Sequence, residues 1–169
     1  MKVTDIKTFV VDCFRTNWVF VKVYTDEGID GVGEGTLEYK EKALVGAVEH
    51  IKSYLVGKDP RQIEKHYHDI YRDAYWRGGA VLMSALSAVE MALWDIKGKA
   101  WGVPVYQLLG GKVRDKIQVY PTGFEVDEYV KLGYKGIKIP MPYSFMHGEF
   151  GMQENEKLVA HARDVFGPD

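Results

Sequence analysis

The sequence predicts an α+β protein: a three-stranded antiparallel meander with a helical layer, followed by the first parallel β/α units of a second domain. Three observations predict this architecture. Strand-forming residues dominate up to Glu34, and helical patterns then follow as far as Leu109. After Gly111, short strand-like runs alternate with helical patterns.

The meander comes from three short segments. Residues 3–13 are rich in Val, Thr, Ile and Phe, and residues 18–25 carry a second strand pattern. Asp26-Glu27-Gly28 has turn chemistry, and residues 31–34 fit a short third strand. The alternate glycines from Gly31 to Gly35 lack the dinucleotide-binding spacing and a Lys-Ser/Thr pair, so a tight turn or strand end is favoured over phosphate binding.

Helical periodicity predicts the second layer. Residues 44–55 and 63–74 each place apolar side chains on one face, and Asp59-Pro60 is a helix-start signal between them. Residues 80–100 form a long, mostly apolar run with many small residues, which predicts a central helix buried on most sides. A short helix that begins at Pro104 ends in paired glycines.

The segment after Gly111 predicts parallel β/α units. Strands are expected at 117–120 and 136–140, with helical turns between them and a helix over 152–165. A (β/α)₈ barrel takes about 200–250 residues, so this segment supplies only the start of a (β/α)8-type barrel, incomplete in this chain. The expected domains are residues 1–113 and residues 114–169.

Composition excludes several functional classes. Apolar residues make up 46% and charged residues 27%, and the net charge of -2 offers no excess of positive charge to nucleic acid or an acidic membrane. Cys13 is the one cysteine, so no internal disulfide forms and a reducing compartment is favoured. The N-terminus has no signal-peptide pattern, and no run approaches the ~20 apolar residues of a membrane helix. We therefore expect a cytoplasmic protein with no membrane or nucleic-acid partner.

Two basic residues lie near the end of the second predicted barrel strand. Lys138 is at its carboxyl end, where barrels place their active sites. His147 lies in the following loop. The alternatives are an exposed lysine at a strand edge and a loop histidine without a role.

Two clusters of aromatic and polar residues occupy junctions between elements. Arg15, Asn17 and Trp18 lie between the first two strands or at the start of the second, and Tyr75-Trp76-Arg77 precedes the Gly78-Gly79 break. Such residues could close over a polyhydroxy acid, and they could equally cap the edge of the core. Both interpretations stay open from the residues alone.

Other titratable residues favour structural roles. His66 and His68 are two positions apart on a helix, so they cannot chelate one metal and are interpreted as surface or packing histidines. Asp95 precedes Lys99 by one helical turn, which favours an ion pair. A buried network that holds the helix to a neighbour is the second interpretation of Asp95, and catalysis is the third.

Four groups of motifs together resemble the mandelate racemase/muconate lactonizing enzyme branch of the enolase superfamily. The last two groups, in this order, are the most specific, and the whole is similar to rhamnonate- and galactonate-type acid-sugar dehydratases. The motifs are Thr25-Asp26-Glu27-Gly28 with Gly31-Val32-Gly33-Glu34, Arg77-Gly78-Gly79 with Ser84-Ala85, Ala92-Leu93-Trp94-Asp95-Ile96-Lys97-Gly98-Lys99, and Val103-Pro104-Val105-Tyr106-Gln107-Leu108-Leu109-Gly110-Gly111.

The resemblance implies a two-part molecule. An N-terminal capping domain carries loops that select substrate, and a modified (β/α)₈ barrel holds Mg²⁺ on carboxylates at the ends of its third, fourth and fifth strands. These ligands are expected beyond Asp169, with no metal ligand in this chain. In the implied reaction a base removes the proton α to a carboxylate, the cation stabilises the enediolate, and the β-hydroxyl leaves as water to give a 2-keto-3-deoxy acid.

The resemblance also assigns the end of the second barrel strand. Lys138 matches the first lysine of a family Lys-x-Lys element, which holds the substrate carboxylate and stabilises the intermediate. Pro140 replaces the second lysine, a base in racemases, which argues against two-base racemisation on this strand. The acid and base of a dehydratase are then expected from later barrel strands.

The expected substrate-binding residues lie on loops. The first specificity loop carries Arg15, Asn17 and Trp18, and residues 34–39 fall on the second. The expected residues are Arg15, Asn17, Trp18, Arg77 and His147.

The complete protein is therefore expected to be a magnesium-dependent sugar-acid dehydratase and a homo-oligomer that acts on a small sugar acid. This chain by itself is expected to be inactive. One alternative is an epimerase, racemase or cycloisomerase of the same superfamily. The other is a non-catalytic module that a partner completes.

Overall fold

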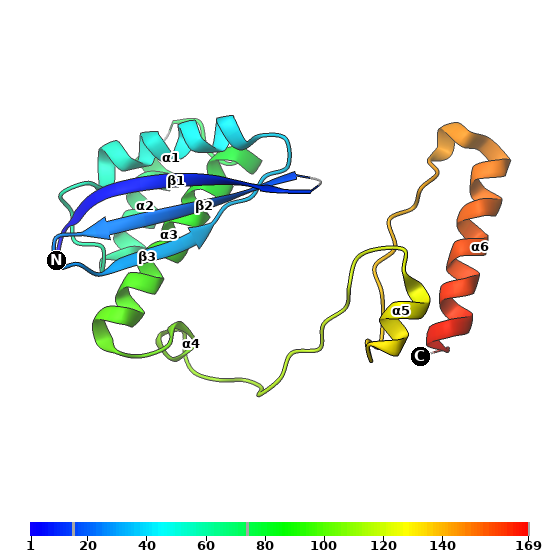
Figure 1. The fold of residues 1–169 in the computed structure, drawn as a ribbon. Helices are drawn as coiled ribbons and strands as arrows, with labels where there is room; N and C mark the ends of the chain where they lie inside the picture. Colours follow the sequence, from blue (N-terminus) through cyan, green and yellow to red (C-terminus); the bar gives the residue numbers. More distant parts are fainter. Residues whose placement is uncertain (15, 74, 169) are drawn as a thin grey trace. The chain divides into compact units, whose positions relative to one another are not determined.

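The computed structural model describes residues 1–14, 16–73 and 75–168, and the chain divides into two compact units (Figure 1). The first unit is Met1–Lys112 and the second is Val113–Asp169. The first unit holds a sheet with helices against it, and the second is mainly helical in its described part. Each unit is described by itself.

The sheet of the first unit confirms the predicted antiparallel meander, in the order β1-β2-β3. Its second strand begins early enough to include Asn17 and Trp18. Alternation along that strand turns Val19, Val21 and Val23 toward the helices, and all three are fully buried. The strands are β1 Val3–Cys13, β2 Thr16–Thr25 and β3 Asp30–Glu34.

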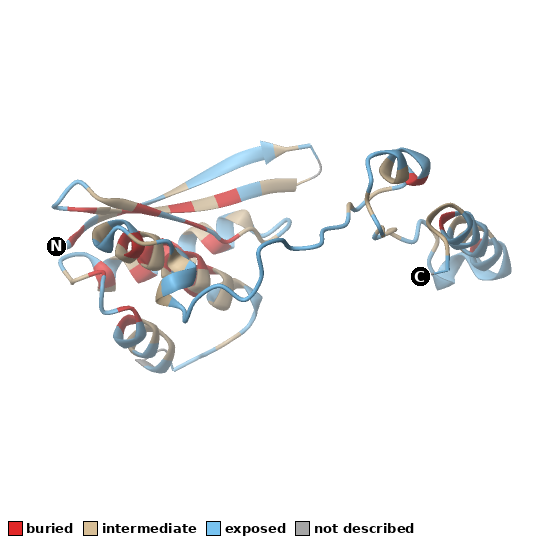
Figure 2. Cartoon of the chain, turned by 90° about the horizontal axis from the view of Figure 1, so that it is seen from below, coloured by how far each residue is buried: buried red, intermediate tan, exposed pale blue. Residues whose placement is uncertain are grey.

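The predicted helical layer lies against one face of this sheet (Figure 1). The longest helix is α3, which packs on β3 and on α1. Buried residues gather where the sheet meets the helices (Figure 2). The helices of the described part are α1 Glu41–Leu55, α2 Ile63–Asp73, α3 Ala80–Trp101 and α4 Val105–Leu108.

Gly31 and Gly33 let β3 approach the backbone of α3. A Cβ built on Gly33 would lie 1.9 Å from the carbonyl oxygen of Ala88, and one on Gly31 would lie 2.0 Å from that of Ala92. Both glycines lie inside β3, where they pair with Val23 and Val21, and neither has a positive φ. The turn interpretation is therefore wrong for these two positions, and close packing between strand and helix is the reason for glycine there.

Asp95 joins α3 to β3. Its Oδ2 accepts a hydrogen bond from the backbone N–H of Val32 at 3.0 Å and pairs with the ammonium of Lys99 at 2.8 Å. Lys99 also donates to the carbonyl oxygen of Asp30 at 2.8 Å. The predicted ion pair is confirmed, and it also connects the helix to a strand.

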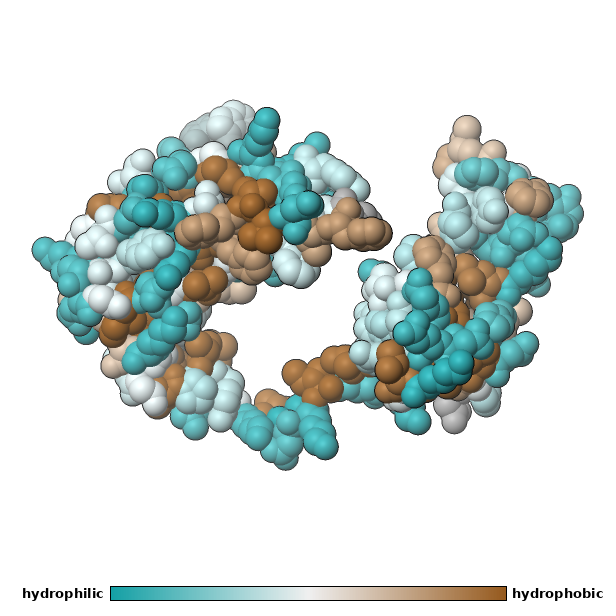
Figure 3. Space-filling view, viewed as in Figure 1, coloured by the Kyte–Doolittle hydropathy of each residue, from teal (hydrophilic) through white to brown (hydrophobic). Residues whose placement is uncertain are grey.

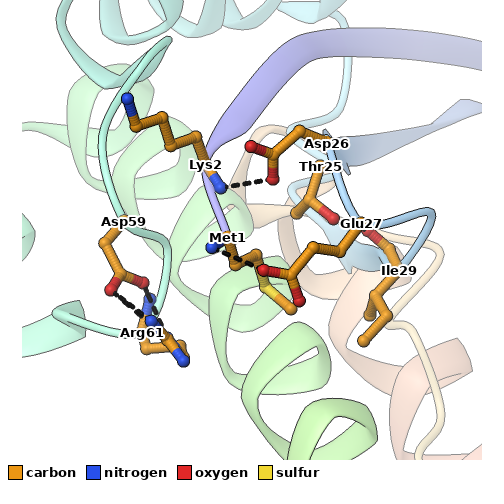
Figure 4. A network of polar contacts seen from close by, with 8 residues as sticks. All are labelled: Met1, Lys2, Thr25, Asp26, Glu27, Ile29, Asp59 and Arg61. Carbon is orange, nitrogen blue, oxygen red and sulfur yellow. Dashed lines mark hydrogen bonds and ion pairs between the residues drawn. The ribbon is translucent and has the colours of Figure 1, made fainter.

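A polar network surrounds the start of β1 and the turn between β2 and β3 (Figure 4). The backbone nitrogens of Met1 and Lys2 each lie 2.6 Å from a carboxylate of the β2–β3 turn, those of Glu27 and Asp26 respectively. The N–H of Val3 donates to a carbonyl of the α1–α2 connection at 2.9 Å. These contacts bind the start of β1 to both neighbouring connections.

His66 is a packing histidine of α2. Its side chain is 2% exposed, and its Nε2 lies 2.7 Å from the carbonyl oxygen of Asp59. Its Nδ1 lies 3.4 Å from the hydroxyl of Tyr54. Asp59 in turn makes a bidentate ion pair with Arg61, which lowers the pKa of Asp59 to about 2. Of the two interpretations, packing is confirmed and the surface position is wrong for His66.

The second unit contains less regular structure than predicted. The expected strands 117–120 and 136–140 do not form, and one isolated parallel bridge joins Thr122, two residues beyond the first of them, to Lys138 within the second. Two short parallel segments need further strands to form a stable sheet, and residues 113–168 place none beside them. The helical elements are α5 Val126–Lys131, η1 Phe145–His147 and α6 Gly148–Phe166.

Apolar side chains are exposed on both units (Figure 3). In the first unit, Phe9 and Val11 lie on the sheet face opposite the helices. In the second unit, Ile117, Val119 and Tyr120 are all more than half exposed. The predicted strand 117–120 therefore has no buried face.

Candidate functional site

Two loops meet at one end of the sheet of the first unit (Figure 1). The hairpin between β1 and β2 lies beside the segment that leads from β3 into α1. Val19 donates its N–H to the Thr36 hydroxyl at 3.1 Å and accepts from the N–H of Gly35 at 2.9 Å. Asn17 donates from its amide to the carboxylate of Glu41 at 3.5 Å. We call this surface, formed by the described residues 14, 16–18 and 34–40, the loop end.

A hollow of about 270 Å³ opens beside the loop end. Its lining is polar, because it includes the carboxylate of Glu34 and the hydroxyl groups of Thr36, Ser84 and Ser87. Such groups can exchange hydrogen bonds with the hydroxyls of a polyhydroxylated ligand. The lining residues are Glu34, Gly35, Thr36, Met83, Ser84 and Ser87.

Aromatic side chains are exposed at the loop end. Phe14 is fully exposed, Tyr39 is 69% exposed, and Trp18 is half-exposed with its ring edge-on to Phe20 at 6.3 Å. Phe14 and Tyr39 also have positive φ angles, 53° and 61°. The sequence offers one signal that could have drawn attention to Phe14. It is a large apolar residue at a hairpin tip, a position that Gly, Asn or Asp usually occupies.

Of the expected first-loop residues, Asn17 and Trp18 follow one another in β2, so their side chains point to opposite faces of the sheet, Asn17 toward Glu41 of α1 and Trp18 toward the face with Phe20. Arg15 lies outside the described residues. The sequence analysis assigned neither Ser84 nor Ser87 to a site, because both are far along the chain from Glu34 and Thr36, and only the packing of α3 brings them to the same hollow.

Arg77 lines a different cavity of about 250 Å³ between α1, α2 and α3. Its guanidinium lies 5.9 Å from the ring centre of Tyr71. Most of the lining is apolar, with Ile51, Ile70 and Leu86 among its walls. Among the described residues, Arg77 lines this cavity and not the polar hollow. The structure therefore does not bring Arg77 together with the residues of the β1–β2 hairpin.

The polar edge of the second cavity is an ionised carboxylate. Asp69 pairs with the ammonium of Lys65 and accepts a hydrogen bond from the hydroxyl of Tyr54. Lys65 first, and then Tyr54, lower the pKa of Asp69 below its usual range. A carboxyl group held ionised in this way is a poor general acid at neutral pH.

Lys138 is anchored by its backbone in the second unit. Its N–H donates to the carbonyl of Pro121 at 2.9 Å, and its own carbonyl accepts from the N–H of Gly123 at 3.1 Å. Its side chain is exposed. The parallel bridge to Thr122 means that both segments run in the same direction.

His147 ends the short helix η1. Its Nδ1 accepts a hydrogen bond from the N–H of Ser144 at 3.1 Å, and its ring lies edge-on to Tyr143 at 5.5 Å. Because Nδ1 accepts, the neutral ring carries its proton on Nε2. The exposed imidazole therefore presents a donor on its other side.

The described residues supply no metal centre, since they contain no group of three or more His, Cys, Asp or Glu side chains that could hold an ion. Along the same described ranges, no helix is long and apolar enough to cross a membrane.

Residues 4–110 match the family described as mandelate racemase / muconate lactonizing enzyme, N-terminal domain. The match covers more than half of the chain, and the chain belongs to this family. It is the N-terminal portion of an enolase-superfamily protein, in which this capping domain precedes a barrel.

Two curated relatives agree with this assignment. A D-galactonate dehydratase family member from Marinomonas sp. (strain MWYL1) is 44% identical, covering 82% of this chain and 37% of the relative. D-galactonate dehydratase of Pectobacterium atrosepticum is 41% identical, covering 99% of this chain and 46% of the relative. The chain therefore spans less than half the length of these curated relatives.

Solved structures show the same relationship. A member of the enolase superfamily from Salmonella Typhimurium has a TM-score of 0.86 at 30% identity, covering 99% of this chain and 53% of that one. An enolase from Pantoea ananatis with bound D-gluconate and Mg has a TM-score of 0.73 at 37% identity, covering 82% of this chain and 36% of that one.

Proposed function

We propose that this chain is the N-terminal portion of a sugar-acid dehydratase. The complete protein removes the proton α to a carboxylate and the β-hydroxyl as water, which gives a 2-keto-3-deoxy acid. The observation that carries the proposal is the 41% identity, over 99% of this chain, to a D-galactonate dehydratase. The polar hollow at the loop end supports it, because its hydroxyl and carboxylate groups suit a ligand rich in hydroxyls.

In this proposal the loops of the first unit select the substrate. The amide of Asn17 and the ring of Trp18 contact the sugar acid from the loop end, together with Arg15. Arg77 belongs to the same proposed set, although the cavity that it lines lies between the helices. His147 donates from Nε2 to a substrate oxygen.

Lys138 supplies a cation to the substrate carboxylate. Backbone hydrogen bonds on both sides hold the residue in place while its ammonium stays exposed. Barrels place their chemistry at the carboxyl ends of parallel strands, and the sequence predicts Lys138 near that end of the expected strand 136–140. A fixed ammonium stabilises the negative charge that builds up when the α-proton leaves.

Magnesium dependence belongs to the proposal for the complete protein. Its support is the Pantoea ananatis relative, which has bound Mg and D-gluconate. The ligands would come from residues outside this chain, and the chain alone would be inactive. A cytoplasmic homo-oligomer is also proposed, and the single cysteine supports a reducing compartment.

The test uses the full-length polypeptide that contains this chain. A panel of sugar acids that includes D-galactonate, D-gluconate and L-rhamnonate is incubated with magnesium, and 2-keto-3-deoxy products are detected with semicarbazide. We expect product from at least one acid and its loss with excess chelator. Absence of product across the panel would overturn the proposal.

An epimerase or racemase is the second candidate within the superfamily. Pro140 disfavours it, because a proline at this position cannot act as the second base of two-base racemisation. Incubation in heavy water separates the two: α-deuterium in recovered substrate without loss of water would favour the epimerase. A non-catalytic module is contradicted if the full-length protein turns over any acid of the panel.

A further inference from the structure

The cavity between α1, α2 and α3 is largely apolar and is separate from the polar hollow. Its volume is about 250 Å³, and each helix contributes apolar side chains to its lining, among them Ile51, Ile70 and Leu86. Ile51 is 5% exposed and Leu86 is 3% exposed, so part of the lining belongs to the core of the first unit. Since a molecule of liquid water occupies about 30 Å³, the cavity has the volume of roughly eight water molecules.

A space of this kind favours an apolar ligand. A cavity with apolar walls offers water few hydrogen-bond partners, and it takes up small aromatic molecules instead. Aromatic rings add to the walls, because Tyr71 and Trp76 also line the cavity. A sugar acid fits poorly, since the hydroxyl groups along its carbon chain would find few partners there. The ligand of this cavity therefore belongs to a different chemical class from the proposed substrate.

A carboxylate on the lining sets the polar group of that ligand. Asp69 lines the cavity, and its contacts with Lys65 and with the hydroxyl of Tyr54 both use Oδ2. In the described part of the chain, no hydrogen bond or ion pair uses Oδ1. An ionised carboxylate accepts hydrogen bonds and donates none, so Oδ1 selects a ligand that carries a donor.

The charges of the lining favour a neutral ligand. Among the described lining residues, Asp69 carries a negative charge and Arg77 a positive one, with His50 taken as neutral. An ammonium group in the cavity would meet the like charge of Arg77, a carboxylate would meet that of Asp69, and either ion would lose hydration. A neutral hydroxyl avoids these costs and still forms a charge-assisted hydrogen bond to the carboxylate.

We propose that the cavity between α1, α2 and α3 binds a small neutral aromatic alcohol. The ring packs against Ile51, Ile70 and Leu86, and the hydroxyl donates to Oδ1 of Asp69. The volume suits about eight non-hydrogen atoms, which is the size of benzyl alcohol. The inference goes beyond the proposed function, and its test requires no measurement of turnover.

Calorimetric titration of the full-length protein with benzyl alcohol tests the site. We expect one site per chain with a Kd on the order of 1 mM, since so small a ligand reaches only modest affinity. Toluene has the same ring without the hydroxyl, and we expect it to bind about fivefold more weakly. Tighter binding of toluene or of benzoate than of benzyl alcohol would overturn the assignment to a neutral alcohol.

A pair of matched variants locates the ligand in the cavity. Ala47→Leu adds apolar atoms to the lining from α1, and we expect it to weaken the binding of benzyl alcohol at least about tenfold. Ala100→Leu is the control, because it makes the same change at a half-buried position of α3 outside the lining. The control should keep the wild-type Kd. Unchanged binding by a folded Ala47→Leu variant would overturn the site.

Asp69→Asn tests the hydrogen bond and does not depend on the fold of Ala47→Leu. The side chain keeps its size and is 28% exposed, so the variant should fold. We expect the affinity for benzyl alcohol to fall to about that for toluene, whereas toluene binding changes less than about twofold.

The remaining outcomes separate this inference from the proposed function. A wild-type Kd for benzyl alcohol in Asp69→Asn would overturn the choice of an alcohol, and no saturable binding to the wild type up to about 20 mM would overturn the site. A full-length protein that binds benzyl alcohol as described but turns over no sugar acid contradicts the proposed function and supports this inference.

Discussion

Gly33→Ala provides the sharpest test of how the sheet packs on α3. The added methyl group would lie 1.9 Å from the carbonyl oxygen of Ala88, whereas real Cβ atoms essentially never approach closer than 3.0 Å. The obstacle is helix backbone, which cannot change rotamer. Relief therefore requires that β3 and α3 move apart by roughly 1 Å, and this displacement opens the core between them.

The magnitude follows from the kind of clash. Overpacking in a core costs about 1–3 kcal/mol and occasionally more, and we expect about 3 kcal/mol here because two backbones collide. For a unit of this size that corresponds to a fall of roughly 10–20 °C in the unfolding midpoint. Gly31→Ala, whose Cβ would lie 2.0 Å from the oxygen of Ala92, should cost a similar amount.

The assay is equilibrium unfolding in urea, followed by far-ultraviolet circular dichroism. Gly46→Ala in α1 is the matched control, because its Cβ would meet nothing within 4 Å. It should stabilise the chain by about 0.5–1 kcal/mol through reduced backbone entropy of the unfolded state. If Gly33→Ala is neutral or stabilising, as the control is expected to be, the close approach of strand and helix is refuted.

Three further predictions address single contacts. Asp95→Ala should cost about 1–2 kcal/mol in urea unfolding, since the N–H of Val32 loses a charged acceptor. Asp59→Asn tests the ion pair between Asp59 and Arg61 through its pH dependence. Arg61 lowers the pKa of Asp59 from 3.8 to about 2. The stabilisation by the ion pair is therefore present above pH 3.8 and disappears as the pH falls toward 2. Wild type and Asp59→Asn should therefore differ in unfolding free energy at about pH 5 and converge near about pH 2. Finally, Lys138→Met in the full-length protein should lower kcat/KM by about 100-fold while unfolding changes by less than about 0.5 kcal/mol, because the side chain is exposed.

Sequence periodicity succeeded where the structural cause is local. The strand pattern of residues 18–25 and the three- and four-residue steps of residues 44–55 both led to the correct element. The same reasoning was wrong for residues 117–120, whose strand pattern is real but whose neighbours are not there to pair with. A strand requires a partner, whereas a helix satisfies its backbone within its own segment.

The candidate site was only partly accessible from the sequence. Asn17 and Trp18 could be located beside a loop, because the predicted second strand begins there. Their separation from Arg77 could not be predicted, since it depends on how α2 and α3 pack. The left-handed backbone of Phe14 and Tyr39 was equally hidden, because neither residue type favours it.

The sequence by itself determined the order of the elements in the first unit and the family, and it predicts Lys138 near the end of a strand-like run. These properties depend on spacing between near neighbours in the chain. The tertiary structure alone decided why Gly31 and Gly33 are glycine and why Asp95 bonds to Val32, 63 positions away. Such contacts arise when β3 and α3 pack directly on each other, and local spacing does not encode that distance.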